Sequence, residues 1–493
     1  MDIQRKLVNA YLWAMLGKWV TRSIGIVSTV ILARILEPES FGLIALAMIC
    51  IGFFEMLQTI GIDRYIIIQT RIDDTLLNSG WTLQIICKFV LYSLLLMCSS
   101  HFAEFFEKPQ LELLIDVVAI NSFFGSFQNI GITLFHKELA FKKLTYLEMV
   151  VKLSSTLTTL VFAYYNPTHW ALVAGGITSL WVNLIGTYFI CDFRPSFNFK
   201  FEKKMFSFSF YIWVRNIFSY SRSKADAFIV SKLFDSSAIG MYKIGSDFAL
   251  LPLSEIIYPA GQAILPGLAK YKDNKKELFD KTYKYLALIY LFVFPSTVGI
   301  WFISPQICTV ILGDKWVDTA PIISALSILM ISYPISAITT NLFDYLGKEK
   351  FSIYNDIFGL TAIGFIAISF AFEDINQFSQ IRGYIGIVML LFVIIFARIT
   401  IQVSIKKIIE LMLPSSLASA FMLLFLLEVH SNSNMTITGL LTNIFFGGLT
   451  YIIFFLLLII LIKPYSKIWH FWYIKFNGML QTTINKYTNL GIE

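Results

Sequence analysis

The chain has 493 residues, of which 57% are hydrophobic and only 14% are charged, and its mean hydropathy is +0.70. A soluble protein of this length would leave too much apolar surface in water, so the composition excludes that class. The formal net charge of +7 does not indicate a nucleic-acid-binding protein, because the basic residues follow a membrane topology.

Apolar runs of about 20 residues recur along the chain, which is the length that a helix needs to cross the hydrocarbon of a bilayer. The runs are continuous and do not alternate, so they indicate helices and not the strands of a membrane barrel. The N-terminal "MDIQRKLVNAYLW" starts with basic residues but is followed by no small-residue cleavage site, so we expect a retained first span. The pattern predicts an all-α, polytopic membrane protein with fourteen spans, near residues 9–35, 41–60, 79–102, 110–134, 144–165, 168–192, 206–234, 240–266, 284–311, 318–345, 353–372, 383–405, 412–429 and 437–462.

Basic residues sort the connecting segments into two sides. With the N-terminus inside, 25 of the 39 lysines and arginines of the chain fall in inner segments and ten lie within spans. The longest inner loop is "AKYKDNKKELFDKTYK" (269–284). The outer loops hold only Arg34, Lys108, Lys315 and Arg382. This is the positive-inside pattern, so we expect both termini in the cytoplasm, which requires an even number of spans.

Two stretches share one pattern. "ARILEPESFGLIALA" (33–47) and "SKLFDSSAIGMYKIG" (231–245) both combine basic, apolar, acidic and small residues, and Gly42 matches Gly240. The match superposes span 1 on span 7 and span 2 on span 8, which predicts two parallel, pseudo-symmetric six-helix bundles around a central cavity. The predicted domains are a six-helix bundle over 1–200, a second bundle over 201–408, spans 13 and 14 over 409–465 and a cytoplasmic tail over 466–493.

The charges inside spans 1 and 7 are mostly cations. Lys18 and Arg22 lie four residues apart on one face of span 1. In span 7, Arg215 and Arg222 lie on one stripe, and Lys224 lies on the opposite side. A charge in the middle of a span costs about 2.5–3.5 kcal/mol and usually faces a cavity or a partner. The five residues therefore predict a cationic cavity for an anionic substrate, since guanidinium groups match the geometry of phosphate.

Structural interpretations of these charges remain open. Lys18 lies close enough to the cytoplasmic end of its span to extend its ammonium to the surface. Arg222 and Asp226 can form a self-contained pair along the helix. Glu148 and Lys152 in span 5 have the same spacing, which favours a structural ion pair.

Glu37-Pro38-Glu39 places two acidic residues in the first predicted outer loop, where membrane glycosyltransferases carry an acidic motif that holds a metal. The pair is isolated here, because the sequence has no histidine cluster, no nucleophile–base set and no phosphate-binding glycine loop. The five cysteines fall in or beside apolar runs without metal or redox spacing. We therefore expect no enzyme, no cofactor and no metal site.

The stretch "LARILEPESFGLIALA" (32–47) resembles the junction of spans 1 and 2 in bacterial polysaccharide exporters. Four further stretches are similar in order and spacing, up to about residue 350: "HKELAFKKLTYLE" (136–148), "IGMYKIGSDFALLPL" (239–253), "ILPGLAKY" (264–271) and "ILGDKWVDTAPII" (311–323). The resemblance is to the polysaccharide transporter family, the O-antigen and colanic-acid-type lipopolysaccharide exporters, within the multidrug/oligosaccharidyl-lipid/polysaccharide flippase superfamily.

The resemblance implies a flippase of the bacterial cytoplasmic (inner) membrane. It would move undecaprenyl-pyrophosphate-linked oligosaccharide repeat units by alternating access, for O-antigen, capsule or exopolysaccharide biosynthesis. Its implied partners are this substrate, membrane lipid, a polysaccharide polymerase and a chain-length regulator. Members of the superfamily are driven by ion gradients, and Glu55, Asp226 and Glu255 are the candidate ion-coupling residues by their positions in spans.

Three alternatives remain open, and only the last belongs to another functional class. A multidrug antiporter and a peptidoglycan-precursor flippase share the superfamily, and a membrane glycosyltransferase or polymerase is more remote. The excess of cations on spans 1 and 7 favours a lipid pyrophosphate over a cationic drug.

Overall fold

The computed structural model describes residues 3–57, 62–69, 72–138, 140–201, 210–257, 259, 267–429, 435–475 and 477–478. All regular structure in these residues is helical, as the sequence predicts, and they contain no strand. The chain divides into two compact units, Met1–Lys243 and Ile244–Glu493.

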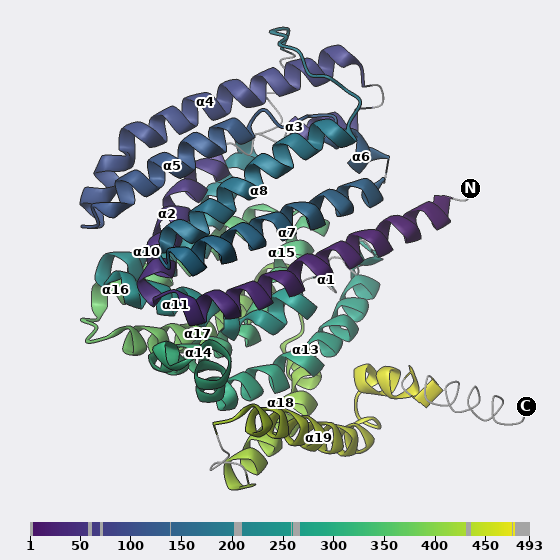
Figure 1. Ribbon diagram of the computed structural model, residues 1–493. Coiled ribbons are helices and arrows are strands. Elements are labelled where there is room, and N and C mark those ends of the chain that lie inside the picture. Colours follow the sequence, from purple (N-terminus) through teal and green to yellow (C-terminus); the bar gives the residue numbers. More distant parts are fainter. Residues whose placement is uncertain are drawn as a thin grey trace, which may run out of the picture. The chain divides into compact units, whose positions relative to one another are not determined.

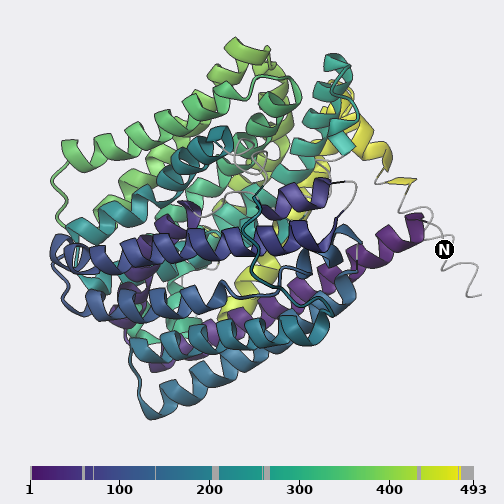
Figure 2. The same cartoon turned by 90° about the horizontal axis from the view of Figure 1, so that it is seen from above.

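The first unit is a layered helical bundle. In it, α4 pairs with α5, α5 packs on α2 and α8, and α7 lies between α8 and α1 (Figure 1). The view from above shows the long helices of this unit side by side (Figure 2). Its elements are α1 (Ile3–Ile35), α2 (Pro38–Leu57), α3 (Ile62–Ile68), α4 (Asp74–Phe105), α5 (Gln110–Gly125), α6 (Ile132–Lys137), α7 (Phe141–Tyr165), α8 (His169–Ile190), α10 (Phe210–Leu233) and the start of α11 (Ser236–Ala249).

The hairpin of α4 and α5 shares a hydrophobic core with α2 and holds one end of α10. Asp73 caps α4 by accepting a hydrogen bond from the backbone N–H of Leu76 at 2.9 Å. Lys232 near the end of α10 donates to the carbonyl of Phe105 at 2.7 Å and pairs with Glu107 at 3.4 Å. A cation at the C-terminal end of α4 is favourable, because the helix dipole is negative there. The hairpin thereby ties the end of α10 to the bundle.

Gly42 in α2 and Gly240 in α11 form a reciprocal helix crossing. A Cβ atom on Gly42 would lie 1.8 Å from the carbonyl oxygen of Ser236, and one on Gly240 would lie 1.9 Å from the carbonyl oxygen of Pro38. Pro38 and Ser236 are themselves equivalent positions of the sequence repeat. The two contacts are therefore related by a local pseudo-twofold axis, and only glycine permits the backbones to approach so closely. The predicted repeat places its matching glycines against each other.

The second unit is built around α13. This helix packs on α14 and α18, α18 packs on α19, and α17 contacts α14, α15 and α16. The elements are the end of α11, η1 (Leu253–Ile257), α13 (Lys275–Gln306), η2 (Ile307–Leu312), η3 (Asp314–Thr319), α14 (Ala320–Ser327), η4 (Ile328–Ile331), α15 (Tyr333–Tyr345), α16 (Lys350–Ser369), α17 (Ile375–Ile401), α18 (Ile405–Val429) and α19 (Ile437–Ile462).

The tenth predicted span is not one continuous α-helix. It divides into α14, the 3₁₀ turn η4 and α15, and Pro334 lies in the first turn of α15. Proline is favoured in that turn because its missing N–H is not needed there. The fully buried Tyr290 of α13 donates its hydroxyl to the carbonyl of Ile331 at 2.8 Å, which satisfies a backbone group at the break.

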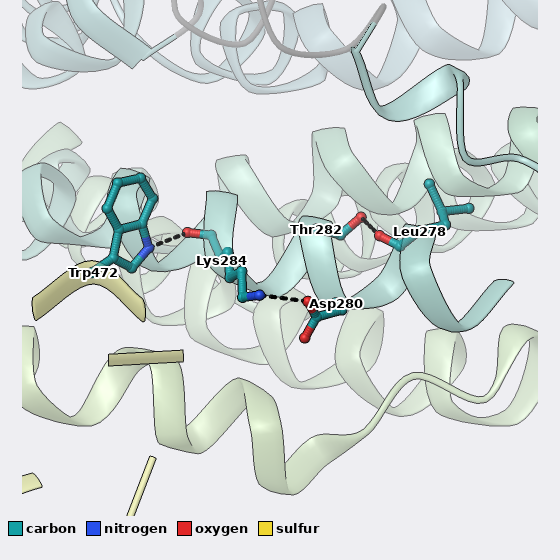
Figure 3. A network of polar contacts seen from close by, with 5 residues as sticks. All are labelled: Leu278, Asp280, Thr282, Lys284 and Trp472. Carbon is teal, nitrogen blue, oxygen red and sulfur yellow. Dashed lines mark hydrogen bonds and ion pairs between the residues drawn. The ribbon is translucent and has the colours of Figure 1, made fainter. Parts of the chain in front are cut away.

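A short helix over residues 467–475 packs back onto the second unit. Trp472 donates its indole N–H to the carbonyl of Lys284 at 2.9 Å, and the Lys284 ammonium pairs with Asp280 at 2.6 Å (Figure 3). Trp469 is almost fully buried and donates to the carbonyl of Glu410 in α18 at 3.0 Å. The predicted cytoplasmic tail therefore begins with a segment that is fixed to α13 and α18.

Ten helical segments in the described residues are long and apolar enough to cross a membrane. The predicted spans near 110–134, 206–234, 240–266 and 353–372 are not among them, although α5, α10, α11 and α16 begin at or near these positions. In the eighth predicted span, α11 ends at Ala249 and the π-helical turn η1 follows, while 258 and 260–266 lie outside the described residues. The count of fourteen stays a prediction.

We predict that Gly42→Ala and Gly240→Ala each lower the stability by about 1–3 kcal/mol, because a methyl group would overlap a backbone carbonyl. Since both act on one crossing, the double variant should lose less than the sum of the two single losses. Thermal unfolding in detergent measures this. Gly176→Ala in α8 is the control, because a Cβ there meets nothing within 4 Å. Additive losses, or single variants as stable as the control, would contradict the crossing.

Candidate functional site

An open cavity of about 600 Å³ lies between α2 and α10 in the first unit. The residues from α10 recur at helical spacing and so form one face of that helix. The lining residues are Met48, Gly52, Glu55 and Met56 from α2, with Asn216, Ser219, Tyr220, Ser223 and Lys224 from α10. The cavity thus contains an acid, a base and four uncharged polar side chains within helices that we predict to span the membrane.

Tyr220 fixes the distance between the two helices. Its hydroxyl donates to the carbonyl of Ile49 in α2 at 2.9 Å. A Cβ on Gly52 would lie 2.5 Å from the same hydroxyl oxygen, so glycine makes room for the phenol. The ring of Tyr220 also lies 6.4 Å from that of Phe53. The phenol therefore forms part of the cavity wall and joins α2 to α10.

Two opposite charges line this cavity. Glu55 reaches it from α2 and Lys224 from α10, and both side chains are exposed. The Lys88 ammonium of α4 also interacts favourably with the Glu55 carboxylate. An acid beside a cation in a spanning region is chemically suited to exchange a proton or a cation. The same cations attract the anionic groups of a ligand.

The other predicted site residues occupy several places. Lys18 and Arg22 are exposed on α1. Arg222 and Asp226 are half-buried on α10 and are not among the residues that line this cavity. Arg215 lies within α10, but its side chain is outside the described residues.

Glu255 lies in η1 of the second unit, where it accepts a hydrogen bond from the hydroxyl of Ser254 at 2.7 Å. Among the predicted site residues whose side chains the structure describes, only Glu55 and Lys224 line this cavity.

Several cavity residues were not predicted from the sequence. Asn216, Ser219 and Ser223 follow one another at spacings of three and four residues, so they form a polar stripe along α10. The stripe of Arg222 and Asp226 on the same helix has the same periodicity, so the sequence alone did not identify which face of α10 lines the cavity. The hydrogen bond of Tyr220 left no comparable pattern in the sequence.

No group of three or more His, Cys, Asp or Glu side chains in the described residues is arranged to hold a metal ion. The two acids of the first predicted outer loop lie at the start of α2, where Glu39 is in the first turn. Acidic side chains at that position interact favourably with the helix dipole, which gives Glu39 a structural role.

Comparison with known proteins identifies relatives of the chain. Residues 31–321 match the family described as polysaccharide biosynthesis protein. The lipopolysaccharide biosynthesis protein WzxC of Escherichia coli (strain K12) is 21% identical over 333 residues, which are 67% of this chain and 68% of WzxC. A putative O-antigen transporter of Shigella flexneri is 24% identical over 364 residues, which cover 70% of this chain and 86% of the transporter.

The fold resembles that of the lipid II flippase MurJ in an inward closed conformation. The TM-score is 0.73 at 16% identity, and the match covers 90% of this chain and 97% of MurJ. This likeness confirms the predicted polytopic, all-α fold class.

We predict that Tyr220→Phe lowers the stability by about 0.5–1.5 kcal/mol, because the hydrogen bond to Ile49 is lost while the ring remains. Thermal unfolding in detergent measures the change. Tyr164→Phe is the matched control, because Tyr164 is 77% exposed on α7. Equal unfolding temperatures for Tyr220→Phe and the control would show that the phenol does not join the two helices.

Proposed function

Since the chain belongs to the polysaccharide biosynthesis protein family, we propose that it is a flippase for lipid-linked oligosaccharides. Its substrate would be an undecaprenyl-pyrophosphate-linked repeat unit, which is used to build O-antigen, capsule or exopolysaccharide. The observation that carries this proposal is the charged, polar cavity between α2 and α10, within predicted spans. A lipid with a large polar headgroup needs such a polar route, because its sugars and phosphates cannot cross hydrocarbon unaided.

The charges favour an anionic headgroup. Lys18 and Arg22 on α1 and Arg222 and Lys224 on α10 supply cations, and a diphosphate carries the complementary charge. The prenyl tail would remain in lipid while the headgroup follows the polar residues. A cationic drug would be repelled by this set, so a multidrug antiporter is the weaker proposal.

The coupling residues are proposed from their chemistry. Glu55 is the first candidate, because a carboxylate that interacts with Lys88 and shares a cavity with Lys224 can exchange a proton or a cation as the surrounding charges change. Asp226 and Glu255 are further candidates by position. Exchange of a bound ion for the anionic substrate would bias the two access states.

We further propose that the protein acts in the bacterial inner membrane with both termini in the cytoplasm. A polysaccharide polymerase and a chain-length regulator are the partners that would receive its product. The proposed work is transport, with no covalent step assigned to any residue of the chain.

We predict that Arg22→Ala and Arg222→Ala each abolish surface polysaccharide in cells whose only copy of the gene carries the change. Loss of a guanidinium in a span removes the attraction for the diphosphate. Gel analysis of surface polysaccharide, with immunoblots of the membrane fraction, measures both export and protein level. Lys276→Ala, at an exposed site in the first turn of α13, is the control. Normal polysaccharide in both arginine variants would contradict a cationic route.

We predict that a cysteine at Lys275 reacts with a membrane-impermeant maleimide only after the cytoplasmic side is opened. Lys275 is exposed at the start of α13, in the lysine-rich segment that the positive-inside pattern places in the cytoplasm. The unmodified protein labelled in parallel gives the background of its five native cysteines. Labelling in intact cells would reverse the proposed orientation.

A further inference from the structure

The seam between α1 and α7 is a feature that the proposed function does not yet use. A Cβ on Gly17 would lie 2.7 Å from a methyl carbon of Thr145, and the Thr145 hydroxyl donates to the carbonyl of Trp13 at 3.2 Å. Farther along, a Cβ on Gly25 would lie 3.5 Å from both Cε and Nζ of Lys152. Both contacts advance in the same direction, so α1 and α7 run parallel and the ammonium of Lys152 rests on α1.

Cations follow this seam from one end towards its middle. The ammonium of Lys142 lies 5.4 Å from the ring centre of Trp13, and Lys18, Arg22 and Lys152 come after it. Lys142 and Lys152 are ten residues apart, which is about 15 Å along a helix. This is roughly half of the hydrocarbon thickness. The row therefore extends from the predicted cytoplasmic end to about the middle of the membrane.

Arg22 and Lys152 repel each other. Arg22 precedes Gly25 by three residues and so lies on the neighbouring turn of the same face. The two cations interact electrostatically. Lys152 is half-buried, where repulsion between like charges is stronger than in water. An anion between the two groups would convert this repulsion into attraction.

The acid expected next to Lys152 does not neutralise it. The i,i+4 spacing predicts an ion pair with Glu148, but Glu148 is exposed, and these two described residues form no such pair. The ammonium is directed at Gly25 of α1 instead. The sequence interpretation of Lys152 as one half of a structural pair is therefore wrong, and its charge remains available to a ligand on the α1 side.

We propose that Arg22 and Lys152 form an anion subsite that binds the phosphate groups of a lipid diphosphate. This inference rests on the proposed function and adds Lys152 to the residues assigned from the sequence. Lys142 and Lys18 would guide the anion to the subsite from the cytoplasmic end. Arg22 supplies a planar pair of donors, and Lys152 a compact charge that the smallness of Gly25 admits.

The test measures binding of undecaprenyl pyrophosphate to the purified full chain in nanodiscs of uncharged lipid. Lys152→Gln should weaken binding about tenfold, whereas Lys152→Arg should stay within about threefold, because the charge is retained. Glu148→Gln should bind like the unmodified protein. Undecaprenol, which lacks phosphate, should bind all four proteins equally.

A second pair of variants leaves every charge in place. Gly25→Ala should bind normally, because 3.5 Å is an ordinary contact distance for a Cβ. Gly25→Val should weaken binding about tenfold by displacing the ammonium. This pair keeps the test decisive if Lys152→Gln does not fold.

The subsite is overturned if Lys152→Gln and Gly25→Val both bind the diphosphate lipid as the unmodified protein does. It is also overturned if Glu148→Gln weakens binding as much as Lys152→Gln, since that result identifies a structural pair. Polysaccharide export by the unmodified chain tests the proposed function separately. If the chain exports polysaccharide but its binding of the diphosphate lipid does not depend on Lys152, only the subsite proposal fails. If binding depends on Lys152 but the chain exports no polysaccharide, only the proposed function fails.

Discussion

The free-energy cost of charge in hydrocarbon governs the arrangement of the first unit. Each ionised side chain in a span must face a cavity, a partner charge or the membrane surface, because desolvation in lipid costs about 2.5–3.5 kcal/mol on insertion scales. Glu55 and Lys224 meet this requirement by facing one cavity. Lys152 lies against α1 at Gly25, where we propose that a bound anion supplies the partner charge. The charged side chains of the first unit therefore gather at two places, the cavity between α2 and α10 and the seam between α1 and α7.

Close contacts between helices fix the position of the cavity between α2 and α10. The crossing of Gly42 and Gly240 brings the starts of α2 and α11 together. Tyr220 joins α2 to α10 at the cavity that Glu55 also lines. Small residues carry such contacts in membranes, where packing and hydrogen bonds replace the hydrophobic effect between helices. The repeat is thus expressed as a local symmetry, and α10 is held in the first unit by contacts at both α2 and α4.

Hydropathy and charge were sufficient to predict the helical class, and the matched stretches predicted the equivalence of Gly42 and Gly240 that their crossing displays. They could not decide which face of a helix lines a cavity. The stripe of Arg222 and Asp226 satisfied the same periodicity as the face of Asn216, Ser219 and Ser223, yet only the latter lines the cavity between α2 and α10. Packing against α2 makes that choice, and a single helix sequence does not contain it.

Spacing along one helix also gave an incomplete account of Lys152. An i,i+4 partner is only one of the neighbours available to a long side chain, and the helix packed alongside can provide another. The 3₁₀ turn η4 was unpredictable for a similar reason, since the hydroxyl of the distant Tyr290 binds the carbonyl of Ile331 there. In both cases the stabilising contact comes from a residue far away in the sequence, so local spacing does not reveal it.

The most direct measurement of the account is transport by the purified chain in proteoliposomes that contain a fluorescent undecaprenyl-pyrophosphate-linked oligosaccharide. Movement between leaflets is followed by the access of a membrane-impermeant quencher or a sugar-modifying enzyme. If the chain is a flippase for lipid-linked oligosaccharides, it will accelerate this movement relative to vesicles without protein and will not transport a cationic dye. Transport of the dye without movement of the lipid-linked sugar would contradict the proposed function.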